Sequence, residues 1–203
     1  MRNTVQHNEA STIVSNADGI IRASDLAVTG VSRQRIARMT QQGELVRVGR
    51  GLYSRPGTDI TENHTLAQAC ARASGTVICL LSALQFHNLT SQSPWQVWIM
   101  IQKDSRVPQM DYPPLSVVRA SGEAFSAGAE EHRIEGVTVR ITGIPKTVAD
   151  CFKFRNKIGL DVALEALKEC LMLRRADRAS IHHFARICRV DHIVSPYMEA
   201  FAL

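Results

Sequence analysis

Long apolar runs are missing from this sequence, and no stretch approaches the roughly 18–20 apolar residues that cross a bilayer. The opening segment, residues 1–9, is polar and lacks the apolar centre of a secretory signal. A paired cysteine pattern is also missing: the five thiols are odd in number, widely spaced and without a C-x-x-C pair. We therefore expect a cytoplasmic protein with no membrane partner, no disulfide framework and reduced, mostly buried cysteines.

Signatures of catalysis and metal binding are absent as well. No lysine follows an acid by two residues, as the D/E-x-K element of a restriction-type nuclease requires, and no D-x-D pair or P-loop occurs. The neighbours His182 and His183 would point about 100° apart on a helix, which does not suit one metal. We interpret Asp150 as a structural residue that pairs with Lys146 or Arg140. No enzyme, metal or cofactor is expected.

Positive charge is concentrated in one segment. The formal net charge is +5, and no lysine precedes Lys103, so every cation of residues 30–55 is an arginine, against the single acid Glu44. The guanidinium fork matches phosphate oxygens and guanine edges, which favours a nucleic-acid partner over the alternative of a solvated basic face. Residues 153–189 form a second basic stretch, which fits either another DNA-contacting surface or a solvated face.

Local patterns predict a helix-turn-helix followed by a β-hairpin. The expected elements are helices over 4–16, 23–28 and 33–42, and strands at 20–21, 44–48 and 52–55. Ser32 is a good N-cap for the third helix, and Val31 and Ile36 suit a hydrophobic staple. Gly43 suits the C-terminal end of that helix. The Gly-Arg-Gly turn at 49–51 then joins two strands into a wing.

The helix after the N-cap is predicted to be amphipathic. At about 100° per residue, Ile36 and Met39 face the core. The opposite stripe, at spacing i, i+3, i+4 and i+7, consists of Gln34, Ala37, Arg38 and Gln41. Glutamine can bond adenine, arginine can bond guanine, and a small alanine lets the helix approach closely. This stripe therefore suits a major groove.

The roles divide between base reading and positioning. We assign base reading to Gln34, Arg38 and Gln41. Arginines at the helix start and on the wing would hold phosphates, which position a protein without specifying sequence. The predicted DNA-binding residues are Ser32, Arg33, Gln34, Arg35, Arg38, Gln41, Arg47 and Arg50. The alternative is a small helical hairpin packed on a β-hairpin, with arginines for solubility.

The remaining sequence predicts a mixed α/β domain. Helices are expected over 65–74, 82–89, 146–154, 160–172, 180–188 and 195–201, and strands over 95–101, 115–119 and 137–141, whereas 76–81 fits a strand or a helix start. Core-facing positions of the long helix are Leu160, Ala163, Leu164, Leu167 and Leu171. The fold class is α+β: an N-terminal winged helix-turn-helix at 1–60, followed by a mixed α/β C-terminal domain at 61–203.

Three parts of the chain are similar to the AbiEi family of antitoxins. Residues 30–38 and 43–53 resemble its N-terminal domain, and residues 82–89 resemble its S-A-L-x-x-H-x-L segment. Residues 144–151 resemble its R-T-V-x-D segment, with Lys146 in place of arginine. The resemblance implies a winged-helix DNA-binding domain and a C-terminal α/β domain. It also implies repression of the protein's own operon at operator repeats, beside a gene for a nucleotidyltransferase-like toxin.

We therefore predict a sequence-specific DNA-binding transcriptional repressor, the autoregulating antitoxin of a type IV abortive-infection pair. Its partners would be double-stranded DNA carrying operator repeats and a nucleotidyltransferase-like toxin. The oligomeric state stays open, with cooperative binding of monomers on DNA as one form. One alternative is an antitoxin that acts by direct protein contact through its C-terminal domain. A metal-dependent nuclease is the other.

Overall fold

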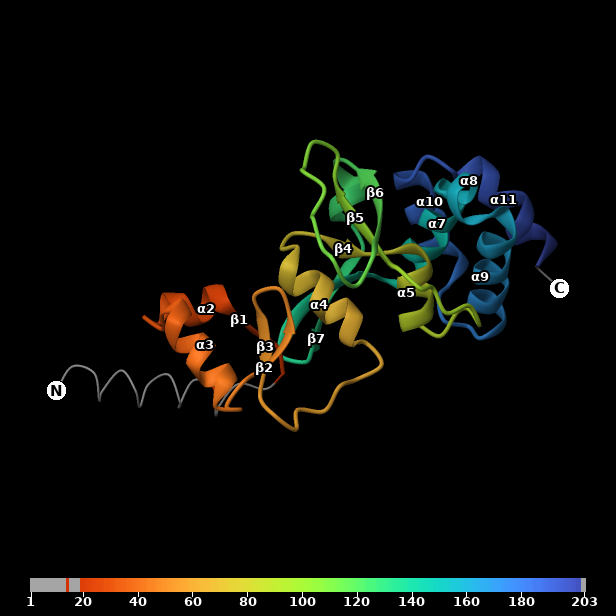
Figure 1. Cartoon of the computed structure of the whole chain (residues 1–203). Coiled ribbons are helices and arrows are strands. Elements are labelled where there is room, and N and C mark those ends of the chain that lie inside the picture. The colour runs from red at the N-terminus through yellow and green to blue at the C-terminus, as the bar shows by residue number, and fades with distance from the viewer. Residues whose placement is uncertain (1–13, 15–18, 202–203) are drawn as a thin grey trace. The chain divides into compact units, whose positions relative to one another are not determined.

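The structure is a computed structural model that describes Val14 and residues 19–201 (Figure 1). The helix expected over 4–16 therefore lies almost wholly outside the described residues. The chain divides into two compact units: residues 1–74 with 133–139, and residues 75–132 with 140–203. The domain boundary expected between residues 60 and 61 stays a prediction. No helix in the described part of the chain is long and apolar enough to cross a membrane.

The first unit is a winged helix-turn-helix. Its elements are β1 (Ile21–Arg22), α2 (Ala23–Val28), α3 (Arg33–Gln41), β2 (Val46–Gly49), β3 (Leu52–Ser54) and α4 (His64–Arg72). The three strands form an antiparallel sheet in the order β1-β3-β2. The small core beneath them is made of Val14, Ile21, Leu26, Val31, Ile36, Met39 and Leu45. The predicted fold class of this part is confirmed.

Both ends of α3 are formed by the signals that the sequence carries. The Ser32 hydroxyl accepts a hydrogen bond from the backbone N–H of Arg35 at 3.2 Å, which satisfies one free donor of the first turn. At the other end Gly43 takes a φ of +75°, a left-handed conformation that costs a glycine little. The N–H of Glu44 then donates to the carbonyl of Met39 at 2.9 Å and closes the helix.

Glu135, in the turn after Ile134, contacts two distant segments of the first unit. Its carbonyl accepts from the N–H of Ile20 at 2.7 Å, and its carboxylate accepts from both the N–H and the hydroxyl of Thr61 at 2.9 and 2.8 Å. The ring of His64 pairs with the other carboxylate oxygen at 2.5 Å. Gly19 has a φ of +98°, and a Cβ there would meet the Glu135 carbonyl at 2.1 Å, so only glycine fits.

The C-terminal part of the chain contains a five-stranded mixed sheet in the order β6-β5-β4-β8-β7. The strands are β4 (Val77–Ile78), β5 (Val97–Gln102), β6 (Leu115–Ala120), β7 (Ala129–Ile134) and β8 (Val137–Thr142). β5 runs parallel to β6 and antiparallel to β4, and β4 runs parallel to β8. The helices are α5 (Leu80–Phe86), α6 (Glu123–Ser126), α7 (Ile144–Lys153), α8 (Arg155–Ile158), α9 (Leu160–Met172), α10 (Arg178–Ile187) and α11 (Asp191–Ala200). Mixed α/β architecture is thereby confirmed for the C-terminal part.

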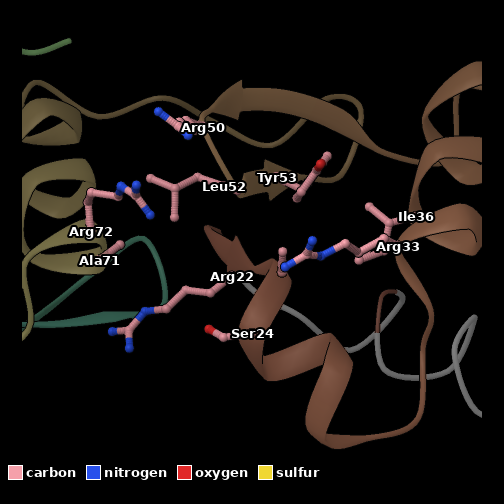
Figure 2. Close-up of a pocket in the computed structure, with 11 residues that line it drawn as sticks. Arg22, Ser24, Arg33, Ile36, Arg50, Leu52, Tyr53, Ala71 and Arg72 are labelled. Atoms are coloured by element: carbon pink, nitrogen blue, oxygen red, sulfur yellow. The ribbon is translucent and has the colours of Figure 1, made fainter. Parts of the chain in front are cut away.

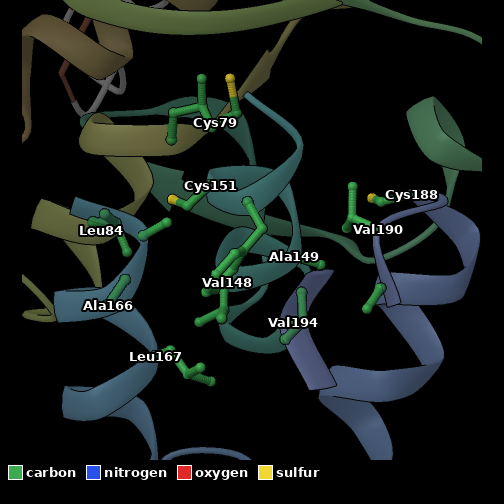
Figure 3. Close-up of a cluster of buried hydrophobic side chains, with 14 of the residues drawn as sticks. Cys79, Leu84, Val148, Ala149, Cys151, Ala166, Leu167, Cys188, Val190 and Val194 are labelled. Atoms are coloured by element: carbon green, nitrogen blue, oxygen red, sulfur yellow. The ribbon is translucent and has the colours of Figure 1, made fainter. Parts of the chain in front are cut away.

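The main core of the second unit packs around α7. Val148 and Ala149 of α7 lie among Leu167 of α9 and Val194 of α11, as Figure 3 shows, and all four are fully buried. All five cysteines are free and buried, as the sequence predicts. Residues 76–81, for which either a strand or a helix start was predicted, contain both: β4 ends at Ile78, and α5 begins at Leu80.

Several details of the second unit differ from the sequence prediction. β7, α6 and α8 were not predicted at all. Leu160 was expected to face the core, yet it is 38% exposed. The buried face of α9 is instead made of Val162, Ala163, Ala166, Leu167 and Cys170. Ala163 and Leu167 were predicted correctly, and the rest of the buried face consists of Val162, Ala166 and Cys170 rather than the further leucines.

Candidate nucleic-acid interface

The exposed side of α3 has the predicted pattern. Ile36 and Met39 are 2% and 0% exposed and anchor the helix in the small core. The opposite side presents exposed side chains, which are Gln34, Ala37, Arg38 and Gln41. Residues 34 to 41 span about 10 Å along a helix axis at 1.5 Å per residue. That length covers about three base-pair steps of a duplex.

The β2–β3 hairpin carries its arginines at the turn and on the first strand. Arg50 is exposed at the turn, and Arg47 is exposed on β2. The Nε of Arg47 donates to the carbonyl of Gly49 at 3.2 Å, and the strand register shifts between these two residues. This local bond restrains the Arg47 side chain but leaves its two terminal nitrogens for a phosphate.

The other predicted DNA-binding residues lie at the N-terminal turn of α3 and differ in their exposure to solvent. Arg33 is exposed, whereas Arg35 is half-buried. The Ser32 oxygen is occupied as the helix cap, so its O–H remains as the donor for an outside acceptor. Arg33 is therefore the better placed of the two arginines for a phosphate.

Two arginines outside the predicted set of DNA-binding residues lie beside this surface. A hollow of about 510 Å³ in the first unit is lined by Arg22 and Arg72 together with Arg33 and Arg50 (Figure 2). Arg22 lies at the end of β1 and Arg72 in the last turn of α4. They are fifty positions apart, and no local pattern links them, so linear spacing could not have found the pair.

The remaining titratable clusters have structural partners. Lys146 donates to both carboxylate oxygens of Asp150, with the two side chains 1% and 0% exposed. The thiol of Cys188 also donates to Asp150 at 3.3 Å. Burial raises the pKa of Asp150, and the Lys146 ammonium acts in the opposite direction. Asp150 is thus paired with Lys146, one of the two partners predicted for it.

His182, in the histidine-rich C-terminal segment, forms an ordinary surface pair with an acidic residue. His182 contacts the carboxylate of Asp191 at 2.7 Å, with both side chains more than a third exposed. Among the described residues, no group of three histidine, cysteine or acidic side chains is arranged to hold a metal ion.

Together, a capped helix with an exposed polar stripe, a short preceding helix and a three-stranded sheet with a basic hairpin define a winged helix-turn-helix. Residues 9–56 match a family model described as "Transcriptional regulator, AbiEi antitoxin". This part of the chain is therefore similar to the AbiEi regulator domain, which confirms the resemblance seen in residues 30–53. The match does not reach residues 82–89 or 144–151, where the resemblance stays a prediction.

Comparison with solved structures extends the likeness in fold beyond that domain. The crystal structure of the Rv2827c protein from Mycobacterium tuberculosis is similar with a TM-score of 0.59, over 87% of this chain and 69% of that one. The two sequences are 15% identical, so the likeness concerns the fold alone. None of the curated proteins compared with the chain matches it.

Proposed function

We propose that this protein is a sequence-specific DNA-binding repressor that places α3 in the major groove. The observation that carries the proposal is the arrangement of α3: a glutamine–arginine stripe faces outward while Ile36 and Met39 hold the helix on the core. In this docking Arg38 bonds a guanine edge, and Gln34 and Gln41 bond adenine edges. The stripe length leads us to expect about three directly read base-pair steps per bound copy.

The arginines around the stripe would hold the duplex backbone. Arg33 at the start of α3, Arg47 on β2 and Arg50 at the hairpin turn approach phosphates on either side of the read bases. Arg35, which is half-buried, contributes to the same set with less reach. These contacts supply most of the affinity, make it salt-dependent and leave the sequence preference to the helix.

We further propose that the chain is the autoregulating antitoxin of a type IV pair. The AbiEi description of residues 9–56 supports this assignment. Its DNA target is then a set of repeats upstream of its own operon, and its partner gene encodes a nucleotidyltransferase-like toxin. In a type IV pair the antitoxin neutralises the toxin without holding it in a complex.

The DNA-binding proposal is tested with two arginine variants of the full chain in gel-shift titrations at several salt concentrations. Arg38→Ala should cost about 1–3 kcal/mol on the preferred site and little on unrelated duplexes. Arg50→Ala should weaken binding to all duplexes and reduce the slope of log K against log salt by about one. Arg106→Ala, which removes an exposed arginine outside both basic stretches, is the charge-matched control. Wild-type affinity in both variants would refute the docking.

The antitoxin proposal is tested separately by co-expression with the neighbouring gene. Neutralised toxicity without co-purification of the two products is the expected result. Co-purification with neutralisation would instead support an antitoxin that acts by direct contact through its C-terminal domain. Absence of any neutralisation would leave a DNA-binding regulator and remove the antitoxin role.

A further inference from the structure

Four arginines from four separate elements line one hollow of about 510 Å³ in the first unit. Figure 2 shows them around the space between the β2–β3 hairpin, α2, α3 and α4. The cationic lining residues are Arg22, Arg33, Arg50 and Arg72. Leu52 and Ile36, which are 3% and 2% exposed, supply apolar wall next to these guanidinium groups. A charged group beside apolar wall is screened less than one in open solvent.

The electrostatics of this hollow call for an anion. No acidic side chain lines it, and within the described part of the chain no carboxylate forms an ion pair with these four arginines. Like charges that share one site repel each other, and a bound anion relieves that repulsion. Guanidinium groups offer donors and no acceptors, so the complementary ligand is an acceptor-only group such as a phosphate.

The elements that carry the arginines are bonded to one another. Gln68 of α4 donates its side-chain N–H to the carbonyl of Val48 at 2.7 Å, which attaches α4 to the hairpin. The N–H of Ala23 donates to the carbonyl of Gly51 at 2.9 Å, which attaches the start of α2 to the hairpin turn. Arg22 is paired with Leu52 in the β1–β3 ladder. These bonds set the backbone positions of Arg22, Arg50 and Arg72 before any ligand arrives, and the buried Ile36 and Met39 hold α3, which carries Arg33, on the core.

The position of the hollow within the proposed DNA interface indicates where the phosphate would come from. Two of the four, Arg33 on α3 and Arg50 on the hairpin turn, already belong to the predicted DNA contacts. A duplex strand that separates the major groove under a helix from the minor groove under a wing has to pass between those two elements. The hollow lies at that place, lined from both sides.

We propose that this hollow binds a backbone phosphate of the operator duplex, with Arg22 and Arg72 as two further phosphate ligands. The proposal rests on the proposed DNA-binding function and extends its contact set beyond the helix and the wing. It also brings α4, which begins at His64, into the DNA-contacting surface. The contact is independent of sequence, because it involves only the sugar-phosphate backbone.

The test uses the full chain with Arg22→Ala and Arg72→Ala in fluorescence-anisotropy titrations of a labelled duplex. Each variant should lower the slope of log K against log salt by about 0.9, and lower affinity about eightfold near 0.1 M salt, equally on preferred and unrelated duplexes. Arg133→Ala removes an exposed arginine of the same unit that does not line the hollow, and it should keep the wild-type slope. Far-UV circular dichroism and melting confirm that each variant is folded.

A second measurement separates the possible failures. Inorganic pyrophosphate is added to the protein without DNA, and melting is followed for wild type and both variants. If wild type binds DNA but the two variants keep its slope and affinity, the phosphate assignment is overturned while the DNA-binding function stands. Stabilisation by pyrophosphate that only wild type shows, combined with unchanged slopes, would assign the hollow to a free phosphorylated compound instead. If wild type does not bind DNA at all, the proposed function itself fails.

Discussion

Replacing Asp150 with alanine should be among the most damaging single changes in the second unit. The substitution leaves the Lys146 ammonium, 1% exposed, without its carboxylate partner, and it removes the acceptor of the Cys188 thiol. Breaking a buried ion pair from one side costs about 3–5 kcal/mol, because an uncompensated charge remains in the interior. The double variant Lys146→Met/Asp150→Leu removes both charges and should recover wild-type stability or exceed it.

Urea unfolding followed by tryptophan fluorescence is the suitable assay. Both tryptophans, Trp95 and Trp98, belong to the second unit, so their emission reports that unit alone. His182→Ala breaks the half-exposed pair with Asp191 and serves as the control, with an expected loss of less than about 1 kcal/mol. The reasoning would be refuted if Asp150→Ala were as mild as this control, or if the double variant were as unstable as the single one.

Three further outcomes are expected. Ser32→Ala should lower stability by about 1 kcal/mol in thermal melts followed by circular dichroism. Ser24→Ala, which changes an exposed serine that caps no helix, is the control, and equal melting of the two variants would contradict the cap. Burial alone would raise the pKa of Glu135, but the hydrogen bonds from His64 and Thr61 outweigh it and lower that pKa. The ionised carboxylate therefore stabilises the fold above about pH 4.5 and loses this effect as pH falls through the lowered pKa. Acid unfolding of Glu135→Gln should therefore be less steep than that of wild type. Identical stability-against-pH profiles for the two proteins would count against the contact. Burial raises the pKa of Cys170 to about 11, so at neutral pH a thiol reagent should label it only after unfolding; rapid labelling of the native protein would disprove its burial.

Much of the first unit could be predicted because its signals are local. A cap at Ser32, a glycine at 43 and two buried apolar residues four and seven positions after the cap define α3 without any distant contact. The wing follows from two short strands around a Gly-Arg-Gly turn. Each of these signals acts within a few residues, so reading along the chain finds it.

The features that were missed depend on distant contacts. β7 reads as Ala-Glu-Glu-His-Arg-Ile, whose charged residues disfavour a central strand, yet β7 is the edge strand of its sheet, where charge is tolerated. The contact set of Glu135 joins residues more than seventy positions apart. Arg22 and Arg72 line the same hollow from β1 and α4, and a hydrogen bond from Gln68 joins α4 to the hairpin. None of these arrangements produces a periodic pattern in the sequence.

The central claim is that the outward stripe of α3 reads a duplex, and site selection from a pool of random duplexes tests it most directly. Full-length wild type should enrich one short motif, and the double variant Gln34→Ala/Arg38→Ala should lose that preference while keeping salt-dependent affinity for DNA in general. Enrichment of the same motif by the double variant, or no enrichment by wild type, would contradict the account.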